Sequence, residues 1–277
     1  MHVIFLLLGT LGHIEKVRPN VSEEQAVLLD SFEAISTARK YAIYPDVCHY
    51  TGETGASPNE FVENWDCYYK YESSTDVTHF AVAGDSNAAD VANGFRLNEI
   101  SNASMSGSGC SLVPKKMTGS CRSMFTDFIS YLNSEAEIDV LVLTNLFTQD
   151  EYANSSVVEL AQFWSRFNGR IVFLHDTPRF PQHRERLLRG ENPTIDLHYD
   201  NLKIPNDVLT YLQDKGFHTM SRNSLFCEIN SCSYFSKMGD ILISDARGEH
   251  LSPLGAKLFV ESLVNALPPL SLTIENL

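Results

Sequence analysis

A short apolar segment that ends in a sharp turn most constrains how this chain can fold. Residues 78–83 read Thr-His-Phe-Ala-Val-Ala, which is typical of a buried β-strand. Gly84-Asp85-Ser86 follows, and the glycine permits a tight turn before the helix-compatible residues 88–92. A strand that turns directly into a helix places Ser86 at the carboxyl end of the strand, where open α/β sheets bind ligands.

The rest of the chain alternates in the same way. Further strands are predicted at residues 138–143, 170–175 and 240–244, and helices at 24–41, 88–93, 123–132, 157–167, 206–215 and 253–266. This pattern indicates an α/β protein with a parallel sheet that is covered on both faces. The chain has 277 residues, of which 43% are hydrophobic, and no repeat divides it, so we expect one compact domain over residues 24–277.

The residue types near the two ends of this region suit acyl transfer through a serine ester. A serine hydroxyl is a weak nucleophile at neutral pH and needs an imidazole to take its proton, and Ser86 and His250 are the candidates. A carboxylate that accepts a hydrogen bond from one ring nitrogen fixes the other nitrogen as the base, and Asp245 is near His250 in sequence. Ser252-Pro253 then predicts the cap and first turn of a helix.

These motifs together resemble the SGNH hydrolase superfamily, and in particular the SGNH domain fused to the membrane-embedded acyltransferase-3 domain of carbohydrate O-acetyltransferases. The resemblance covers roughly residues 48–267 and rests on Gly84-Asp85-Ser86, on Asp245 followed by residues 250–256 (His-Leu-Ser-Pro-Leu-Gly-Ala), and on the cysteines around them. It implies a three-layer α/β/α sandwich with a mainly parallel, flavodoxin-like sheet. It also implies Ser86 as nucleophile, His250 as base and Asp245 as the acid.

The chain departs from the family pattern at the acid and at the oxyanion hole. The usual acid precedes the histidine by three residues, whereas Asp245 precedes it by five, and Glu249 is an alternative. The family's oxyanion hole combines the amide of the serine, here Ser86, with a glycine amide and an asparagine side chain, which stabilise the developing negative charge. The matching donors are Gly107, with Gly109 as an alternative, and Asn145, which follows the predicted strand 138–143 and has an alternative interpretation as a turn residue.

Six cysteines fall into three pairs that are close in sequence: Cys48 with Cys67, Cys110 with Cys121, and Cys227 with Cys232. An even count fits three local disulfides in an oxidising compartment, although sequence alone leaves the connectivity open. Zinc binding and buried thiols are the alternatives, but the tight Cys-x2-Cys spacing of structural zinc sites does not occur. We therefore predict disulfides, no metal and no cofactor.

The charge and the N-terminus bear on partners and location. With 21 Lys and Arg against 35 Asp and Glu, the formal charge of −14 repels phosphate backbones, which makes nucleic acid an unsuitable partner. Residues 3–12 are apolar but too few to span a bilayer. Residues 1–23 are interpreted as the residual end of a membrane helix, a weak signal or a linker, with a buried element of the domain as a further alternative.

The resemblance implies an extracytoplasmic domain that is tethered to a membrane through a preceding domain. Its predicted function is to transfer an acyl group, specifically acetyl, to a carbohydrate hydroxyl through an acyl-Ser86 intermediate, with the acyl donor delivered by an acyltransferase-3 domain. Two alternatives remain: an esterase or deacetylase that uses the same residues and releases the acyl group to water, and a glycan-binding module without activity.

Overall fold

The computed structural model describes most of the domain but not the two ends of the chain. The described residues are 22–43, 49–51, 66–71, 78–134, 137–147, 149–176, 180, 186, 189, 194–196, 204–223, 227, 231–236, 238, 240–243 and 249–267. Residues 1–21 lie outside them, so the predicted domain boundary near residue 23 stays a prediction.

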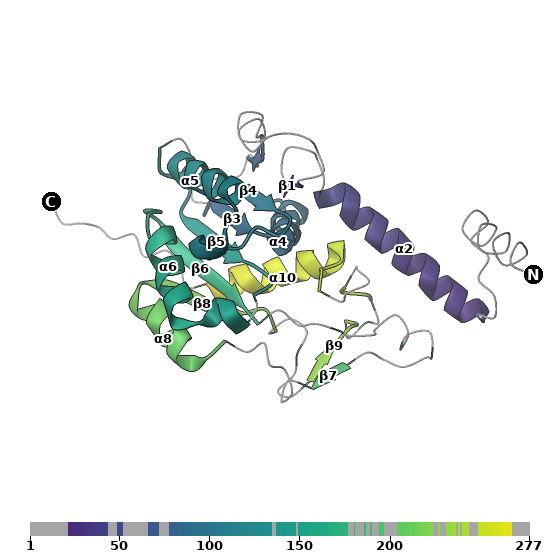
Figure 1. The fold of residues 1–277 in the computed structure, drawn as a ribbon. Coiled ribbons are helices and arrows are strands. Elements are labelled where there is room, and N and C mark those ends of the chain that lie inside the picture. Colours follow the sequence, from purple (N-terminus) through teal and green to yellow (C-terminus); the bar gives the residue numbers. More distant parts are fainter. Residues whose placement is uncertain are drawn as a thin grey trace, which may run out of the picture.

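A seven-stranded sheet forms the centre of the fold (Figure 1). Its main path runs in the order β1 (His49–Tyr50), β4 (Asn102–Gly107), β3 (Phe80–Gly84), β5 (Val140–Thr144), β6 (Arg170–His175) and β8 (Phe217–Ser221). Every pair along this path is parallel. The short β2 (Tyr68–Tyr69) pairs antiparallel with β4, and β7 (Thr194–Asp196) and β9 (Ser231–Ser233) form a separate antiparallel pair. The five strands from β4 to β8 follow the flavodoxin-like order, in which ligands bind where the order reverses beside the first strand, here β3.

Helices cover both faces of the sheet, which confirms the predicted three-layer α/β/α sandwich. One layer contains α5 (Gly119–Ser134), α6 (Asn154–Trp164) and α8 (Asn206–Asp214), and the other contains α2 (Glu23–Ile43), α4 (Ser86–Leu97) and α10 (Pro253–Ala266). Two short 3-10 turns, η1 (Pro114–Lys116) and η2 (Gln149–Tyr152), connect elements of the first layer. None of the helices in the described part of the chain is both long and apolar enough to cross a bilayer.

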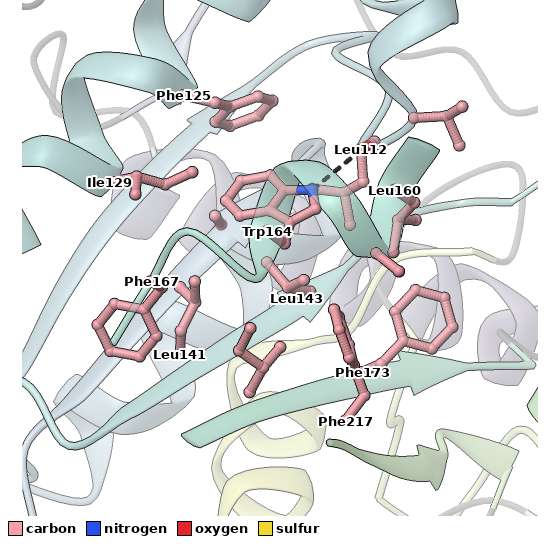
Figure 2. Close-up of a cluster of buried hydrophobic side chains, with 14 of the residues drawn as sticks. Leu112, Phe125, Ile129, Leu141, Leu143, Leu160, Trp164, Phe167, Phe173 and Phe217 are labelled. Atoms are coloured by element: carbon pink, nitrogen blue, oxygen red, sulfur yellow. Dashed lines mark hydrogen bonds between the residues drawn. The ribbon is translucent and has the colours of Figure 1, made fainter. Parts of the chain in front are cut away.

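The alternation of side chains along the strands divides the core into two apolar clusters. On β5, Leu141 and Leu143 point to the layer of α5, α6 and α8, whereas Val140 and Val142 point to the layer of α4 and α10. Figure 2 shows the first cluster, in which the buried Trp164 lies between the sheet and α5 and its indole nitrogen donates to the carbonyl of Leu112 at 3.0 Å. Because both faces of β3, β5 and β6 are buried, their sequences are mostly apolar.

The sheet contains several strands that the sequence does not predict. β1 and β2 have two residues each, and the sequences of β4 and β8, Asn-Ala-Ser-Met-Ser-Gly and Phe-His-Thr-Met-Ser, lack an apolar run. The predicted strand at 240–244 is wrong, since the described residues there form only isolated bridges, from Ile241 to Phe235 and from Ile243 to Leu251. The polar β4 is nevertheless fully buried, because strand pairing on both sides satisfies its backbone.

Two of the predicted disulfides are confirmed. Cys110 is bonded to Cys121 and Cys227 is bonded to Cys232. Cys67 is also disulfide-bonded, and its predicted partner Cys48 lies outside the described residues. These bonds are typical of proteins that fold in an oxidising compartment.

Candidate active site

The turn after β3 places Ser86 at the carboxyl edge of the sheet. Gly84 has a φ of +150°, and a Cβ atom there would lie 1.8 Å from the carbonyl oxygen of Thr144 on the neighbouring β5, so the strand end requires glycine. Asp85 caps α4: its carboxylate accepts from the amides of Asn87 and Leu146, each at 2.8 Å. Ser86 is the first residue of α4, where helix geometry leaves the backbone amide without an intrahelical acceptor.

His250 lies beside Ser86 although the two residues are 164 positions apart. The Oγ atom of Ser86 is 3.3 Å from Nε2 of His250. The histidine is held by the residues that follow it, because Ser252 caps α10 through the amide of Gly255 at 2.9 Å and donates to the carbonyl of Ile241 at 2.7 Å. The structure therefore brings together the two residues that the sequence pairs as nucleophile and base.

The carboxylate at the other ring nitrogen of His250 is that of Asp90. Its Oδ2 atom is 2.9 Å from Nδ1 of His250 and accepts from the amide of Leu251 at 3.2 Å. Asp90 follows Ser86 by four residues on α4, and residues at this spacing lie on one face of a helix. This four-residue spacing could have identified Asp90 from the sequence, whereas the family motif indicates Asp245 as the acid. Asp245 lies outside the described residues, so its predicted role is not tested.

Asp90 is buried and is held by a cation from α2. The Nε atom of Arg39 is 2.6 Å from Oδ1 of Asp90, whose side chain is 1% exposed. Burial by itself raises the pKa of Asp90, but the charges of Arg39 and His250 and their hydrogen bonds outweigh it and hold the pKa below its usual value. This places an ionised carboxylate where it can accept from Nδ1 of His250; in the tautomer with the proton on Nδ1, Nε2 is the ring nitrogen that can accept from Ser86.

The carboxylate of Asp85 and the guanidinium of Arg222 are also buried, and both contact Asn87 in the first turn of α4. Burial raises the pKa of Asp85, although the amides of Leu146 and Asn87 oppose this shift. The side chain of Arg222 is also buried, and burial lowers its pKa. Its Nη1 atom donates to Oδ1 of Asn87 at 2.8 Å, so it braces the first turn of α4 behind the serine.

The predicted oxyanion-hole residues lie at the same edge of the sheet as Ser86. Gly107 ends β4 and Asn145 follows β5, and β4 and β5 are the two neighbours of β3. In the amide orientation that satisfies its hydrogen bonds, Asn145 donates to the carbonyl of Cys110 at 3.1 Å and to Oδ2 of Asp85 at 3.2 Å. Both amide hydrogens of Asn145 are therefore directed at protein acceptors, and its oxyanion role, like that of Gly107, stays a prediction.

His49 is a further buried histidine near this edge, and no sequence pattern pointed to it. It lies on β1, and its Nδ1 and Nε2 atoms are 2.8 Å and 3.0 Å from the hydroxyls of Ser106 and Ser108. Burial, with a smaller contribution from the charge of Arg39, lowers the pKa of His49 to about 4. His49 is therefore neutral at physiological pH and braces the loop after β4. No cluster of three or more potential metal ligands occurs among the residues that the structure describes.

Comparison with known proteins places the chain in a family. Residues 47–264, more than half of the chain, match the family model of the SGNH domain that occurs fused to AT3 (acyltransferase-3) domains. The chain belongs to this SGNH family. No curated protein sequence matches this SGNH domain significantly.

Two solved structures align with this SGNH domain over most of its length. The periplasmic domain of a lipopolysaccharide acetyltransferase from Salmonella ser. Paratyphi A has a TM-score of 0.60 and 14% identity, and the alignment covers 87% of this chain and 98% of that domain. At this identity the likeness shows the fold. A protein from Streptococcus pneumonia described as a platelet activating factor aligns with a TM-score of 0.38 and 12% identity, over 88% of this chain and 99% of that one, and carries no argument.

Proposed function

We propose that this SGNH domain is an acyltransferase that moves an acyl group, specifically acetyl, to a carbohydrate hydroxyl through an acyl-Ser86 intermediate. The observation that carries the proposal is the continuous relay from Oγ of Ser86 through the ring of His250 to the buried, ionised Asp90. A hydroxyl, an imidazole and a carboxylate in this order are the set that serine-dependent acyl transfer needs. Acetyl and carbohydrate are suggested by the fusion named in the family and by the resemblance to O-acetyltransferases.

The chemistry proceeds in two balanced steps. First, Nε2 of His250 takes the proton of Ser86 while Oγ attacks the carbonyl carbon of the acyl donor; the donor's leaving group departs with the proton from His250, and acyl-Ser86 remains. Second, an acceptor hydroxyl gives its proton to Nε2 and attacks the acyl carbonyl, and Ser86 departs and regains the proton. Asp90 stabilises the imidazolium that exists in both steps.

The same reasoning suggests the partner and the location. The family model describes SGNH domains fused to AT3 domains, so the proposed acyl donor reaches Ser86 from a membrane acyltransferase-3 domain. The disulfide bonds fit a location outside the cytoplasm. In the proposal, the domain therefore works on the extracytoplasmic side of a membrane, tethered there by the domain that precedes it.

The first test asks whether Ser86 is an activated nucleophile. A fluorophosphonate probe is expected to label the wild-type protein rapidly and to leave Ser86→Ala unlabelled, because the probe reacts only with a serine whose hydroxyl is deprotonated in the reaction. Absence of labelling in the folded wild type would instead favour the glycan-binding module. Acyl transfer is then separated from hydrolysis by adding sugar acceptors to an acyl donor and measuring acylated sugar against free acid.

A second test decides between the two candidate acids. We expect Asp90→Asn to reduce the labelling rate at least ~100-fold, because the amide no longer selects the tautomer that leaves Nε2 as the base. Asp245→Asn makes the same chemical change at the position that the family motif indicates, and we expect it to change the rate less than about threefold. A large loss in Asp245→Asn with a normal rate in Asp90→Asn would assign the acid to Asp245 and refute this part of the proposal.

A further inference from the structure

The catalytic cluster receives a side chain from outside the region that matches the family model. The match begins at residue 47, whereas α2 ends at Ile43. In Figure 1, α2 lies at the side of the molecule, on the same side of the sheet as α4 and α10. Much of its surface is exposed, including Val27 and Tyr41, but Arg39 is only 9% exposed. A helix that precedes the family domain thus contributes one of the cluster's buried charges.

The guanidinium of Arg39 contacts three parts of the proposed relay. Its Nε atom is 2.6 Å from Oδ1 of Asp90, and its Nη2 atom is 2.8 Å from Nδ1 of His250 and 3.5 Å from the carbonyl oxygen of Ser86. Nδ1 cannot donate to Asp90 and accept from Arg39 at the same time. In the tautomer needed for catalysis, Nδ1 of His250 keeps its proton and donates to an ionised Asp90, so Arg39 acts through its ion pair with Asp90 and not through a hydrogen bond to Nδ1.

The apolar contacts of α2 also support the chain segment that carries His250. Phe32 stacks on Tyr234 with ring centroids 5.8 Å apart, and the hydroxyl of Tyr234 donates to the carbonyl of Ile243 at 2.8 Å. Ile243 bridges to Leu251, the neighbour of His250. One face of α2 thus supports the segment that carries His250, while Arg39 holds Asp90 on α4.

We propose that α2 is a docking helix that completes the catalytic site, with Arg39 as a positioning residue that holds the carboxylate of Asp90 toward His250. The inference rests on the proposed function and adds a form of regulation to it. His250, His49 and Arg222 also interact electrostatically with Asp90, but Arg39 is the guanidinium that pairs directly with its carboxylate. Without that pair, the buried carboxylate takes up a proton more readily, and a protonated Asp90 no longer selects the base tautomer of His250. The reactivity of Ser86 therefore depends on α2 being packed, and the segment before the family domain controls the site.

The test measures the rate of fluorophosphonate labelling against pH in the full chain. We expect Arg39→Gln to react at least ~10-fold more slowly at pH 7 and to recover part of its rate at higher pH, where Asp90 ionises without its cation. Arg39→Lys is expected to restore part of the loss at pH 7. Lys40→Gln is the matched control: it removes the same charge from the next residue of α2, whose side chain is exposed, and we expect the wild-type profile. Phe32→Ala, which weakens docking without touching the relay, is expected to slow labelling as well.

A second measurement separates this inference from the proposed function. Titration of the Asp90 carboxyl by carbon NMR needs no catalytic activity, and its pKa is expected to be higher in Arg39→Gln than in wild type. If Arg39→Gln shows both the wild-type labelling profile and the wild-type titration, the inference is overturned. If the wild type itself is not labelled, the proposed function fails, and the titration alone still decides whether Arg39 holds Asp90 ionised. A merely structural role would lower the stability of Arg39→Gln and leave the pH profile unchanged.

Discussion

The buried histidine on β1 is expected to make the stability of this protein depend on pH. Both ring nitrogens of His49 are hydrogen-bonded to serine hydroxyls, and its pKa is lowered from 6.5 to about 4. In the unfolded chain the same ring takes up a proton near pH 6.5. The unfolded state therefore binds more protons than the folded state between these values, and the contribution of His49 to stability, complete above pH 6.5, is lost as the pH falls toward 4.

The size of this effect follows from the two pKa values. At pH 5 the ring is almost fully protonated in the unfolded chain, whereas in the folded protein about one ring in ten is protonated. At pH 5, proton binding to this ring favours the unfolded state over the folded state by a factor of about 30. This factor corresponds to a decrease of about 2 kcal/mol in the free energy of unfolding between pH 7.5 and pH 5. This loss is a large fraction of the free energy of unfolding of an ordinary domain.

The assay compares urea unfolding of wild type and His49→Gln at pH 7.5 and pH 5. Glutamine retains one donor and one acceptor but does not titrate, so all other ionisable groups contribute equally to both proteins. We expect the wild type to lose about 2 kcal/mol more than His49→Gln over this interval. Equal losses in the two proteins, within about 0.5 kcal/mol, would refute the assignment of His49 as a neutral buried group.

Two further predictions concern the turn before Ser86 and the loop beyond Gly107. Gly84→Ala is expected to lower the free energy of unfolding by about 3 kcal/mol or more, because the new Cβ would overlap the carbonyl oxygen of Thr144. Gly216→Ala is the control: φ is +85° there but the space is open, so urea unfolding should show a loss of only about 1 kcal/mol. Equal losses in the two variants would contradict the steric argument. Replacing both Cys110 and Cys121, which are 11 positions apart, by alanine is expected to lower the free energy of unfolding by about 3 kcal/mol. A midpoint of thermal unfolding equal to that of the wild type would contradict this.

Much of the central layer could be predicted from the sequence, because local patterns specify it. The apolar runs of β3, β5 and β6 and the Ser252-Pro253 start of α10 are read from a few neighbouring residues. β4 could not be predicted in this way. Its polar residues are buried because β1, β2 and β3 pair with it and because the hydroxyl of Ser106 lies against His49, and these contacts come from other parts of the chain.

The sequence by itself determined the α/β class, the position of Ser86 at a strand end, and the histidine that lies beside it, since each depends on a short motif. Only the tertiary structure decided which carboxylate lies at Nδ1 of His250 and which cation holds that carboxylate. Arg39, Asp90 and His250 come from three helical or loop segments that meet when α2, α4 and α10 pack on one face of the sheet. The burial that makes their charges interact strongly exists only after that packing, and no local pattern records it.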